Sequence, residues 1–488
     1  MVVGEVAEGV DLLVVGGGPG GYTAALRASQ LGRQVTLVDA DGDAGVGGVC
    51  LRVGCIPSKA IIEVATLHDD AIHGADRGIV AGQLSIDLAA FQAWKQRRVD
   101  GLTGGVRQLL AAADVRVVAG RFRFNRAGTG VVREGDGPPL FLQYKDVVIA
   151  TGSRPMALPG IPFDGRTVLD SSDVLALEEL PTDIVVVGGG YIGVELGTAL
   201  SKLGSAVTIV ELADRLLPGM DAALARPVAK RLEQLGVTVR LSTAAASFED
   251  GQLVIDGPDG RGTLTTERVV IAVGRVPNTD DLGLESIGVQ RADSGLLDVA
   301  PDRRVSEHIA AIGDVTPGPA LAHKASAEAL VAVEALCGQK VRFEPATIPT
   351  VVFSDPEVAS AGFTVDAARD AGIDVDVVRF PLAASGRAAT IGVRDGFAQL
   401  VVDREVDAVI GVHLAAPHAS ELIAEGVLAI EMAASPQDLA AAIHPHPTFS
   451  ELLGEAAHMA IGVPIHVSGG SVAHEARTTS QSASTMRA

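Results

Sequence analysis

Two cysteines and a lysine stand close together in the segment 47–59, which reads GGVCLRVGCIPSK. Four residues separate Cys50 from Cys55, and Lys59 follows four residues later. Because proline is favoured in the first turn of a helix, Pro57 predicts that a helix begins near Cys55. The N–H groups and dipole of a helix N-terminus lower the pKa of a thiol, and a thiol of low pKa leaves readily in disulfide exchange. The segment therefore suits a redox dithiol.

The spacing alone leaves two other interpretations of the pair open, namely two small buried hydrophobic residues or half of a metal site. The first residues carry no basic n-region, and no apolar run reaches the ~18–20 residues that span a bilayer. We therefore expect a cytoplasmic protein with no membrane partner. A lasting structural disulfide is disfavoured in a reducing compartment, which favours cysteines that cycle chemically. The third cysteine, Cys337, is expected to be an inert packed residue.

The composition indicates a globular chain with several cores, since 488 residues exceed the usual size of one domain and 47% of them are hydrophobic. The net charge of −21 argues against nucleic acid or an anionic membrane as a partner.

A glycine-rich turn near the N-terminus joins a short apolar strand, 12–15, to an alanine-rich helix. The next strand, 35–38, ends on an acid. This order is the βαβ fingerprint of a dinucleotide site, in which glycines let the backbone approach a pyrophosphate and the acid binds ribose hydroxyls. The residues concerned are Gly16, Gly18, Gly21 and Asp39.

The same pattern recurs 172 residues later, with a strand at 184–187 and a second strand that ends on Glu211. Its glycines are Gly188, Gly190 and Gly193. Such a repeat at matching spacing predicts a second βαβ unit and a second dinucleotide.

Glu211 also indicates which pyridine nucleotide binds. A carboxylate accepts hydrogen bonds from a free 2′-hydroxyl but repels a 2′-phosphate, so we expect NAD rather than NADP. Leu212 and Ala213 supply no cation, whereas Arg215 lies close enough in sequence to leave a small doubt.

The remaining pattern completes an α/β fold. Residues 60–110 are predicted to be helical, and a short strand ends at Asp314 before a helix that begins near Leu321. From about residue 348 the pattern changes to an α+β domain, and a mobile tail is expected at the C-terminus. In that domain strands are predicted at 349–353 and 397–402, and helices at 365–371 and 420–434.

In this order the motifs resemble those of the class I pyridine nucleotide-disulfide oxidoreductases, most closely the members that oxidise dihydrolipoamide. The resemblance covers about residues 10–465. It rests on the first glycine fingerprint, G-G-x-C-x4-C-x-P-S-K, A-T-G-S, the second fingerprint with its following glutamate, I-G-D, and a closing H-P-T-x-x-E.

The resemblance implies two Rossmann-like dinucleotide-binding domains and a C-terminal α+β dimerisation domain in a homodimer with shared active sites. The implied divisions are an FAD-binding domain at 1–155, an NAD-binding domain at 156–277, a central segment that completes the FAD site at 278–346, an interface domain at 347–467 and a flexible tail at 468–488.

Catalytic roles follow from the resemblance by matching positions. Cys55 would be the flavin-side sulfur that forms the charge-transfer thiolate, and Cys50 the thiol that exchanges with substrate. Lys59 would pair with Glu195 near flavin N5. The general base and acid on Cys50 would be His446 of the partner subunit, held by Glu451.

The cofactor sites are implied in the same way. Asp314 would bind the ribityl chain of FAD, Ala322 its pyrimidine side and Gly120 its adenine end. The other implied cofactor-binding residues are Thr151, Gly152, Ser153 and Gly274. No metal is expected, although His444 with His446 can also be interpreted as a metal pair.

The implied reaction is oxidation of a protein-bound dihydrolipoyl group by NAD⁺, with a lipoyl-bearing E2 or H protein as partner. Two alternatives stay open: an NADPH-dependent reductase of another low-molecular-weight disulfide, and a flavoprotein scaffold subunit without turnover. Arg52 departs from the asparagine that many relatives have between the cysteines, and the sequence gives it no role.

Overall fold

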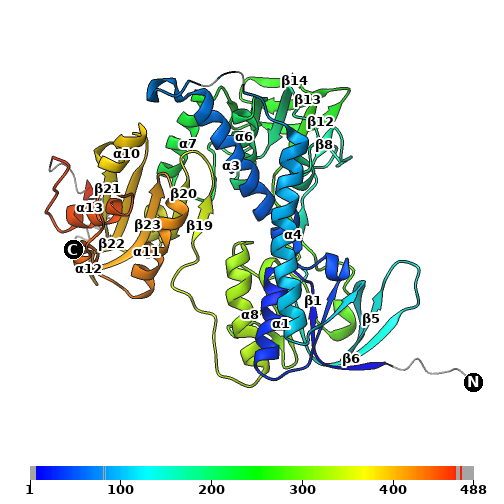
Figure 1. Cartoon of the computed structure of the whole chain (residues 1–488). Coiled ribbons are helices and arrows are strands. Elements are labelled where there is room, and N and C mark those ends of the chain that lie inside the picture. The colour runs from blue at the N-terminus through cyan, green and yellow to red at the C-terminus, as the bar shows by residue number, and fades with distance from the viewer. Residues whose placement is uncertain (1–6, 81, 83, 469–472, 475–488) are drawn as a thin grey trace, which may run out of the picture. The chain divides into compact units, whose positions relative to one another are not determined.

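The computed structural model describes residues 7–80, 82, 84–468 and 473–474, and Figure 1 shows their helices and strands. Two compact units make up the chain. The first contains the described residues up to 188 together with 199–210 and 243–344. The second contains 189–198, 211–242 and the described residues from 345 onward.

The first unit is built on a parallel sheet whose strands lie in the order β18-β6-β1-β2-β3, with β17 antiparallel beside β18. Its central strands are continuous apolar runs because both faces are covered. The chain order reverses between β1 and β6, which is the usual place for a ligand crevice in such sheets. The strands are β1 (Glu8–Val15), β2 (Val35–Asp39), β3 (Arg116–Ala119), β6 (Leu140–Ile149), β17 (Arg304–Ser306) and β18 (Ile309–Ala311).

Helices cover one face of this sheet, and a β-hairpin covers the other. Alanines of α1 (Pro19–Gln30) and α8 (Ala322–Leu336) pack together with Leu110 of α4 (Leu88–Ala112), as the neighbouring positions of the three helices in Figure 1 illustrate. On the opposite face β4 (Arg121–Arg126) contributes two phenylalanine rings and β5 (Thr129–Arg133) contributes Val132 to a second core. This packing on both faces of the sheet fixes the positions of the helix N-termini and of the strand ends.

Two helices separated by one residue carry the cysteine segment, α2 (Gly48–Val53) and α3 (Cys55–Ile72). The prediction of helix over 60–110 holds for most of α3 and α4 but is wrong for the described residues between them, where only the 3-10 turn η2 (Gly74–Arg77) is helical. A left-handed glycine, Gly78 with φ of +79°, ends that turn. A positive φ suits glycine and does not continue a helix.

A second parallel sheet in the first unit has the strand order β10-β9-β15-β8 and shares a core with an antiparallel sheet, β12-β13-β14. The antiparallel pair of β7 with β16 lies where the chain enters and leaves this part of the unit. The elements are β7 (Ser153–Pro155), β8 (Val168–Leu169), α5 (Ser171–Leu175), β9 (Asp183–Val187), β10 (Ala206–Val210), β12 (Ala244–Glu249), β13 (Gln252–Gly257), β14 (Gly260–Thr265), β15 (Arg268–Ile271) and β16 (Arg275–Pro277).

Helix α6 (Tyr191–Lys202) begins in the second unit, which also contains α7 (Ala222–Gln234) and β11 (Thr238–Arg240). Its main sheet has the order β19-β20-β23-β22-β21-β24, and all of its strand pairs are antiparallel. The strands are β19 (Thr350–Val352), β20 (Val358–Gly362), β21 (Val375–Pro381), β22 (Phe397–Asp403), β23 (Ala408–Ala415) and β24 (Ala473–His474).

Helices α11 (Ala419–Glu431) and α13 (Glu451–Ala460) pack on this sheet and form its core. The predicted strands and helices of the α+β domain are confirmed, with the helix predicted at 420–434 ending at Glu431. The predicted tail, 468–488, lies outside the described residues except for 468 and β24. The other short helices here are α9 (Val365–Asp370), α10 (Gly386–Ile391) and α12 (Pro436–Ala441).

Within the described parts of the chain, no helix is long and apolar enough to cross a membrane.

Candidate active site and cofactor sites

The predicted FAD-binding residues gather at one edge of the first parallel sheet. Gly16 follows β1, Asp39 ends β2, Gly120 follows β3, Thr151–Ser153 follow β6 and Asp314 lies just beyond β18. The strands are parallel and in register, so these positions share the carboxyl edge. Ligands of open α/β sheets bind outside the carboxyl ends of the strands.

The first glycine turn leaves room for a phosphate. Gly16 has a φ of +106°, and a Cβ there would collide with the Ala150 carbonyl. A Cβ on Gly21 would collide with the Gly16 carbonyl oxygen. By contrast, no atom of the described residues lies within 4 Å of a Cβ built on Gly18, the N-cap of α1. Two glycines are therefore needed for chain packing, while the third keeps space open at a helix N-terminus, which attracts anions.

The acid at the end of β2 is tied to this turn. Asp39 Oδ2 accepts a hydrogen bond from the Gly17 N–H at 2.8 Å, and Oδ1 accepts one from the Asp41 N–H at 3.0 Å. The Gly120 N–H donates to the Asp39 carbonyl at 2.9 Å, which places the predicted adenine-end glycine beside the acid. The carboxylate is thus oriented toward the edge where the ribose is predicted.

The second glycine turn repeats the first. Gly188 has a φ of +112°, and a Cβ there would collide with the Ala272 carbonyl. The Glu211 carboxylate accepts hydrogen bonds from the Gly189 N–H and from the Ala213 N–H, the latter at 2.7 Å. Gly190, like Gly18, has no atom of the described chain within 4 Å of an added Cβ. The predicted repeat is therefore a repeat of geometry as well as of sequence.

Two further glycines of the second site have the expected character. Gly193 is buried in α6, and Gly274 follows β15 with a φ of +138°. A backbone with this φ favours glycine over any residue with a side chain.

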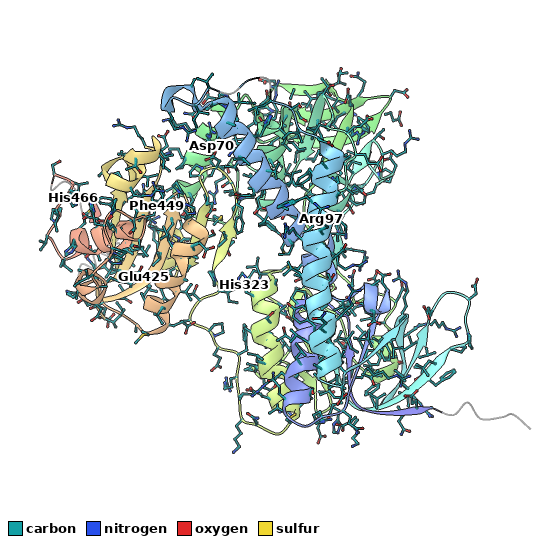
Figure 2. All side chains as sticks on the ribbon, in the orientation of Figure 1. Asp70, Arg97, His323, Glu425, Phe449 and His466 are labelled. Atoms are coloured by element: carbon teal, nitrogen blue, oxygen red, sulfur yellow. The ribbon has the colours of Figure 1, made fainter. Side chains whose placement is uncertain are left out.

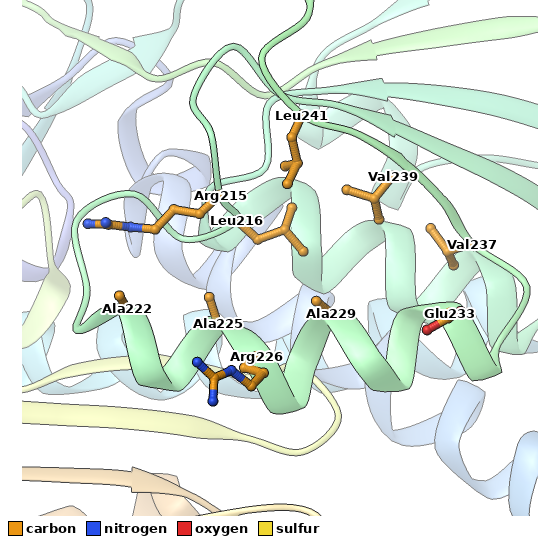
Figure 3. A pocket seen from close by; sticks show the side chains of 10 residues that line it. All are labelled: Arg215, Leu216, Ala222, Ala225, Arg226, Ala229, Glu233, Val237, Val239 and Leu241. Carbon is orange, nitrogen blue, oxygen red and sulfur yellow. The ribbon is translucent and has the colours of Figure 1, made fainter.

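Glu211 and Arg215 differ in their surroundings. Glu211 is 8% exposed and bonded to the glycine turn, whereas Arg215 is exposed and lines a pocket of about 450 Å³ beside α7. In Figure 3 the Arg215 side chain extends beyond one end of this pocket. The pocket is lined by Arg215, Leu216, Ala222, Ala225, Arg226, Ala229, Glu233, Val237, Val239 and Leu241.

The two cysteines are brought together as thiols across the junction of α2 and α3. Cys55 is the first residue of α3, as predicted, and is exposed, while Cys50 is half-buried in α2. A hydrogen bond with the Cys55 thiol, together with burial, raises the pKa of the Cys50 thiol well above its usual range, and the nearby charge of Lys59 only partly offsets this. Cys50 therefore stays protonated at neutral pH and needs a base to react.

Arg52 is held by an ion pair on the same helix as Cys50. Its Nη1 lies 2.9 Å from Asp41 Oδ2, and both side chains are partly exposed. Asp41 is the residue whose N–H also binds the Asp39 carboxylate. The cation between the cysteines is thus bonded to the loop that follows β2, a role that the sequence did not indicate.

Asp314 belongs to a three-residue network. Ser153 Oγ donates to Asp314 Oδ2 at 2.5 Å and accepts from Arg275 Nε at 2.7 Å. Arg275 Nη2 also donates to the Ser153 carbonyl at 2.7 Å. The two predicted flavin-site residues therefore lie in direct contact, and Arg275 binds Ser153.

The A-T-G-S turn has a second anchor in Asn278. Thr151 Oγ1 donates to the Asn278 carbonyl at 2.6 Å, and Asn278 Nδ2 donates to the Thr151 carbonyl at 3.0 Å. The Asn278 N–H also donates to the Gly152 carbonyl at 2.8 Å. Ala322 begins α8, so its predicted site at the flavin coincides with a helix N-terminus.

His446 and Glu451 form the predicted imidazole–carboxylate pair in the second unit. His446 Nδ1 lies 2.8 Å from Glu451 Oε1, and the Thr448 N–H donates to Glu451 Oε2 at 2.8 Å. Partial burial acts to raise the pKa of Glu451, but the hydrogen bonds from Thr448 and His446 keep it below its ordinary value. The His446 side chain is 73% exposed, so Nε2 is available to exchange a proton.

His444 does not share a ligand with His446. Its Nε2 lies 2.8 Å from Oε1 of Glu425, a residue of α11 that is labelled in Figure 2. Among the residues with described placement, no group of three or more His, Cys, Asp or Glu side chains is arranged to hold a metal ion.

Lys59 and Glu195 belong to different helices. Lys59 lies one turn after Cys55 in α3, while Glu195 is 4% exposed in α6 and its Oε1 accepts the Phe353 N–H at 2.9 Å. Their ion pair stays a prediction.

Sequence reasoning missed Arg275 and Asn278 as site residues. The signal that could have found them is the likeness between the two segments A-T-G-S-R-P-M at 150–156 and A-V-G-R-V-P-N at 272–278. These segments form the β7–β16 pair, which contains Arg275 and is followed directly by Asn278.

Comparison with known proteins agrees with this geometry. Residues 10–329 match the family model described as pyridine nucleotide-disulphide oxidoreductase, and residues 348–457 match the dimerisation domain of the same family. The chain belongs to the pyridine nucleotide-disulphide oxidoreductase family. The dimerisation domain makes it a homodimer.

The curated relatives give a narrower likeness. The chain is 47% identical to the dihydrolipoyl dehydrogenase of Geobacillus stearothermophilus over 472 residues, covering 96% of this chain and 99% of the relative. It is 43% identical to the dihydrolipoyl dehydrogenase of Bacillus subtilis over 473 residues, covering 96% and 100%.

Solved structures share the fold. LpdA from Mycobacterium tuberculosis matches with a TM-score of 0.85 and 29% identity, covering 92% of this chain and 99% of that one. The HOCl-induced flavoprotein disulfide reductase RclA from Escherichia coli matches with a TM-score of 0.81 and 27% identity, with coverage of 92% and 99%.

Proposed function

We propose that this chain acts as a dihydrolipoyl dehydrogenase, which oxidises a protein-bound dihydrolipoyl group to the lipoyl disulfide and reduces NAD⁺. The observation that carries the proposal is the contact between the Cys50 and Cys55 thiols at the start of α3. Once this pair is oxidised to a disulfide it can exchange with a dithiol, because each S–S bond that breaks is replaced by one that forms.

FAD and NAD are the cofactors, and the residues fit both of them. Gly18 and Gly190 leave open space in two glycine turns, and each turn has an acid bonded to it. When bound, FAD supplies the transfer of an electron pair between the dithiol and the nicotinamide. The chain binds each pyrophosphate at a helix N-terminus and each adenosine ribose at an acid.

The thiol steps follow from the chemistry of the two cysteines. One dihydrolipoyl sulfur, as a thiolate, attacks Cys50 Sγ of the oxidised pair, and Cys55 leaves with the electron pair of the broken disulfide bond. The second dihydrolipoyl sulfur then attacks the first, forming the lipoyl disulfide and releasing Cys50 as a thiolate. Two protons are released from the substrate, and Cys50 takes one of them back.

His446 of the partner subunit is proposed to move these protons through Nε2. Glu451 binds Nδ1 and so fixes the tautomer with its free lone pair on Nε2, as in other carboxylate–histidine pairs. The raised pKa of Cys50 fits this exchange, since the released thiolate takes a proton back from the imidazolium. Under this proposal each active site requires both subunits.

The proposed partner is a lipoyl-bearing E2 or H protein, because a protein-bound dihydrolipoyl group is the proposed substrate. The cytoplasmic location expected from the sequence is also proposed. The division into domains at 155, 277, 346 and 467 is proposed with it.

A substrate panel on the FAD-loaded dimer tests the function. We expect dihydrolipoamide and NAD⁺ to be turned over, with NADP⁺ and glutathione at least about tenfold poorer in kcat/KM, which corresponds to about 1.4 kcal/mol. A preference for NADPH and glutathione disulfide would favour the first alternative. Inactivity with every disulfide tested would favour a scaffold subunit.

A further inference from the structure

A fully buried ion cluster lies behind the turn that carries Asp314. Glu328 is 0% exposed and Lys324 2% exposed, both on α8. Lys324 Nζ lies 3.2 Å from the Glu328 carboxylate, and Arg303 Nη1 lies 2.9 Å from Glu328 Oε1. Charges buried this completely are costly unless they are paired, so a cluster of this kind needs a reason.

The cluster binds the main chain of Gly313, directly before Asp314, and the side chain of Thr316, two residues after it. Glu328 Oε2 accepts the Gly313 N–H at 2.7 Å, and Lys324 Nζ donates to the Gly313 carbonyl at 3.0 Å. Lys324 Nζ also donates to Thr316 Oγ1 at 2.9 Å, and Thr316 Oγ1 donates to the Gly313 carbonyl at 2.8 Å. All three ammonium protons of Lys324 therefore have acceptors in this network.

The turn itself directs one side chain outward. From Ile312 to Thr316 every residue is buried except Asp314, which is half-buried. Its carboxylate reaches Ser153 Oγ, the contact fixed by Arg275. Lys324 and Glu328 therefore bind the turn at Gly313 and Thr316, while Ser153 binds the Asp314 carboxylate.

We infer that Lys324 and Glu328 are positioning residues for the cofactor: they fix the turn 313–316 so that Asp314 presents its carboxylate to the flavin site. The inference rests on the proposed function for the assignment of Asp314 to FAD. It goes beyond that assignment because neither residue reaches the carboxylate of Asp314 through any of the hydrogen bonds described above.

The charges of the neighbouring groups explain why Lys324 and Glu328 form a buried ion pair at this turn rather than an apolar contact. Glu328 balances one of the two cations, and Asp314 adds a second negative charge that acts on Lys324. Removing Lys324 leaves Glu328 paired with Arg303, whereas removing the charge of Glu328 leaves two cations facing each other. The variant Lys324→Met is therefore the gentler one.

The test measures FAD affinity in the full-length chain. Apoprotein of wild type, Lys324→Met and Glu328→Gln is titrated with FAD while quenching of flavin fluorescence is followed, and thermal unfolding of each apoprotein is recorded. Loss of hydrogen bonds to a charged group predicts a rise in the FAD dissociation constant of about tenfold or more. We also expect a shifted visible spectrum of the bound flavin in both variants.

Glu334→Gln is the matched control. Glu334 lies on the same helix and pairs with Arg27 Nη2 at 2.5 Å, six residues beyond Glu328. We expect this variant to lose stability but to bind FAD within twofold of wild type.

An FAD dissociation constant within twofold of wild type in folded Lys324→Met and Glu328→Gln would overturn the inference. If neither variant folds, Thr316→Val decides, because it removes the hydroxyl between Lys324 and the Gly313 carbonyl at nearly constant volume. An increase of about threefold or more supports the inference, and a smaller change overturns it. Failure of the wild type to oxidise dihydrolipoamide would refute the proposed function but would leave this result standing.

Discussion

Gly18→Ala is the substitution that best isolates the first dinucleotide site from the stability of the fold. Gly18 has φ of −68° and ψ of −177°, a conformation that alanine adopts without strain. No atom in the described part of the chain lies within 4 Å of the added methyl group. As the N-cap of α1, alanine in place of glycine costs up to about 1 kcal/mol.

The effect on FAD binding should be larger. A methyl group would occupy the space that the turn leaves open beside the α1 N-terminus and would keep a phosphate from the backbone N–H groups. Loss of one charge-assisted hydrogen bond costs about 1.5–3 kcal/mol. At about 1.4 kcal/mol for each factor of ten, the FAD dissociation constant rises roughly 10- to 150-fold.

Titration of the apoprotein with FAD and thermal unfolding of the apoprotein together measure both effects. Gly9→Ala is the control, because Gly9 lies on β1, is exposed and also has no described atom within 4 Å of an added Cβ. An unchanged FAD dissociation constant in Gly18→Ala would refute the assignment of a pyrophosphate to this turn. An equal rise in the FAD dissociation constant of Gly9→Ala would refute the argument that the effect arises at the turn of Gly18.

Three further substitutions test the chemistry. Cys50→Ser should retain FAD but lose lipoamide turnover by at least about 1000-fold, and normal steady-state rates would exclude exchange at this sulfur. Glu211→Ala should raise the KM for NAD⁺ about tenfold and narrow the preference over NADP⁺, so unchanged constants for both nucleotides would remove Glu211 from the site. Because the pKa of Glu451 is lowered, its carboxylate stays charged and supports His446 until the pH falls through that lowered value. Glu451→Gln should lower lipoamide turnover about tenfold or more across the neutral range, and a pH–rate profile that matches wild type would contradict this.

The sequence predicted correctly the features that depend on patterns of neighbouring residues. A strand, a glycine turn and a helix need only neighbouring residues, so the turns at Gly16 and Gly188 could be recognised, and their spacing to Asp39 and Glu211 followed. The helix start at Cys55 could be predicted because Pro57 belongs to its first turn.

The contacts that the sequence did not reveal join residues far apart in the chain. Arg275 reaches Ser153 across 122 residues, and Ser153 reaches Asp314 across 161. The buried Lys324 and Glu328 look like an ordinary pair on a helix surface, because a spacing of four residues is typical of solvated salt bridges. Only burial, which depends on the packing of α8 against α1 and the sheet, distinguishes them.

The pKa values of two groups in the proposed catalytic set are shifted in opposite directions: that of Cys50 is raised and that of Glu451 is lowered. The neighbouring thiol and burial raise the pKa of the Cys50 thiol, which slows attack by or release of its thiolate. Hydrogen bonds keep Glu451 ionised, so that His446 Nδ1 is always bound and Nε2 alone changes its proton. Under this proposal the proton that moves in each turnover is carried at Nε2 of His446.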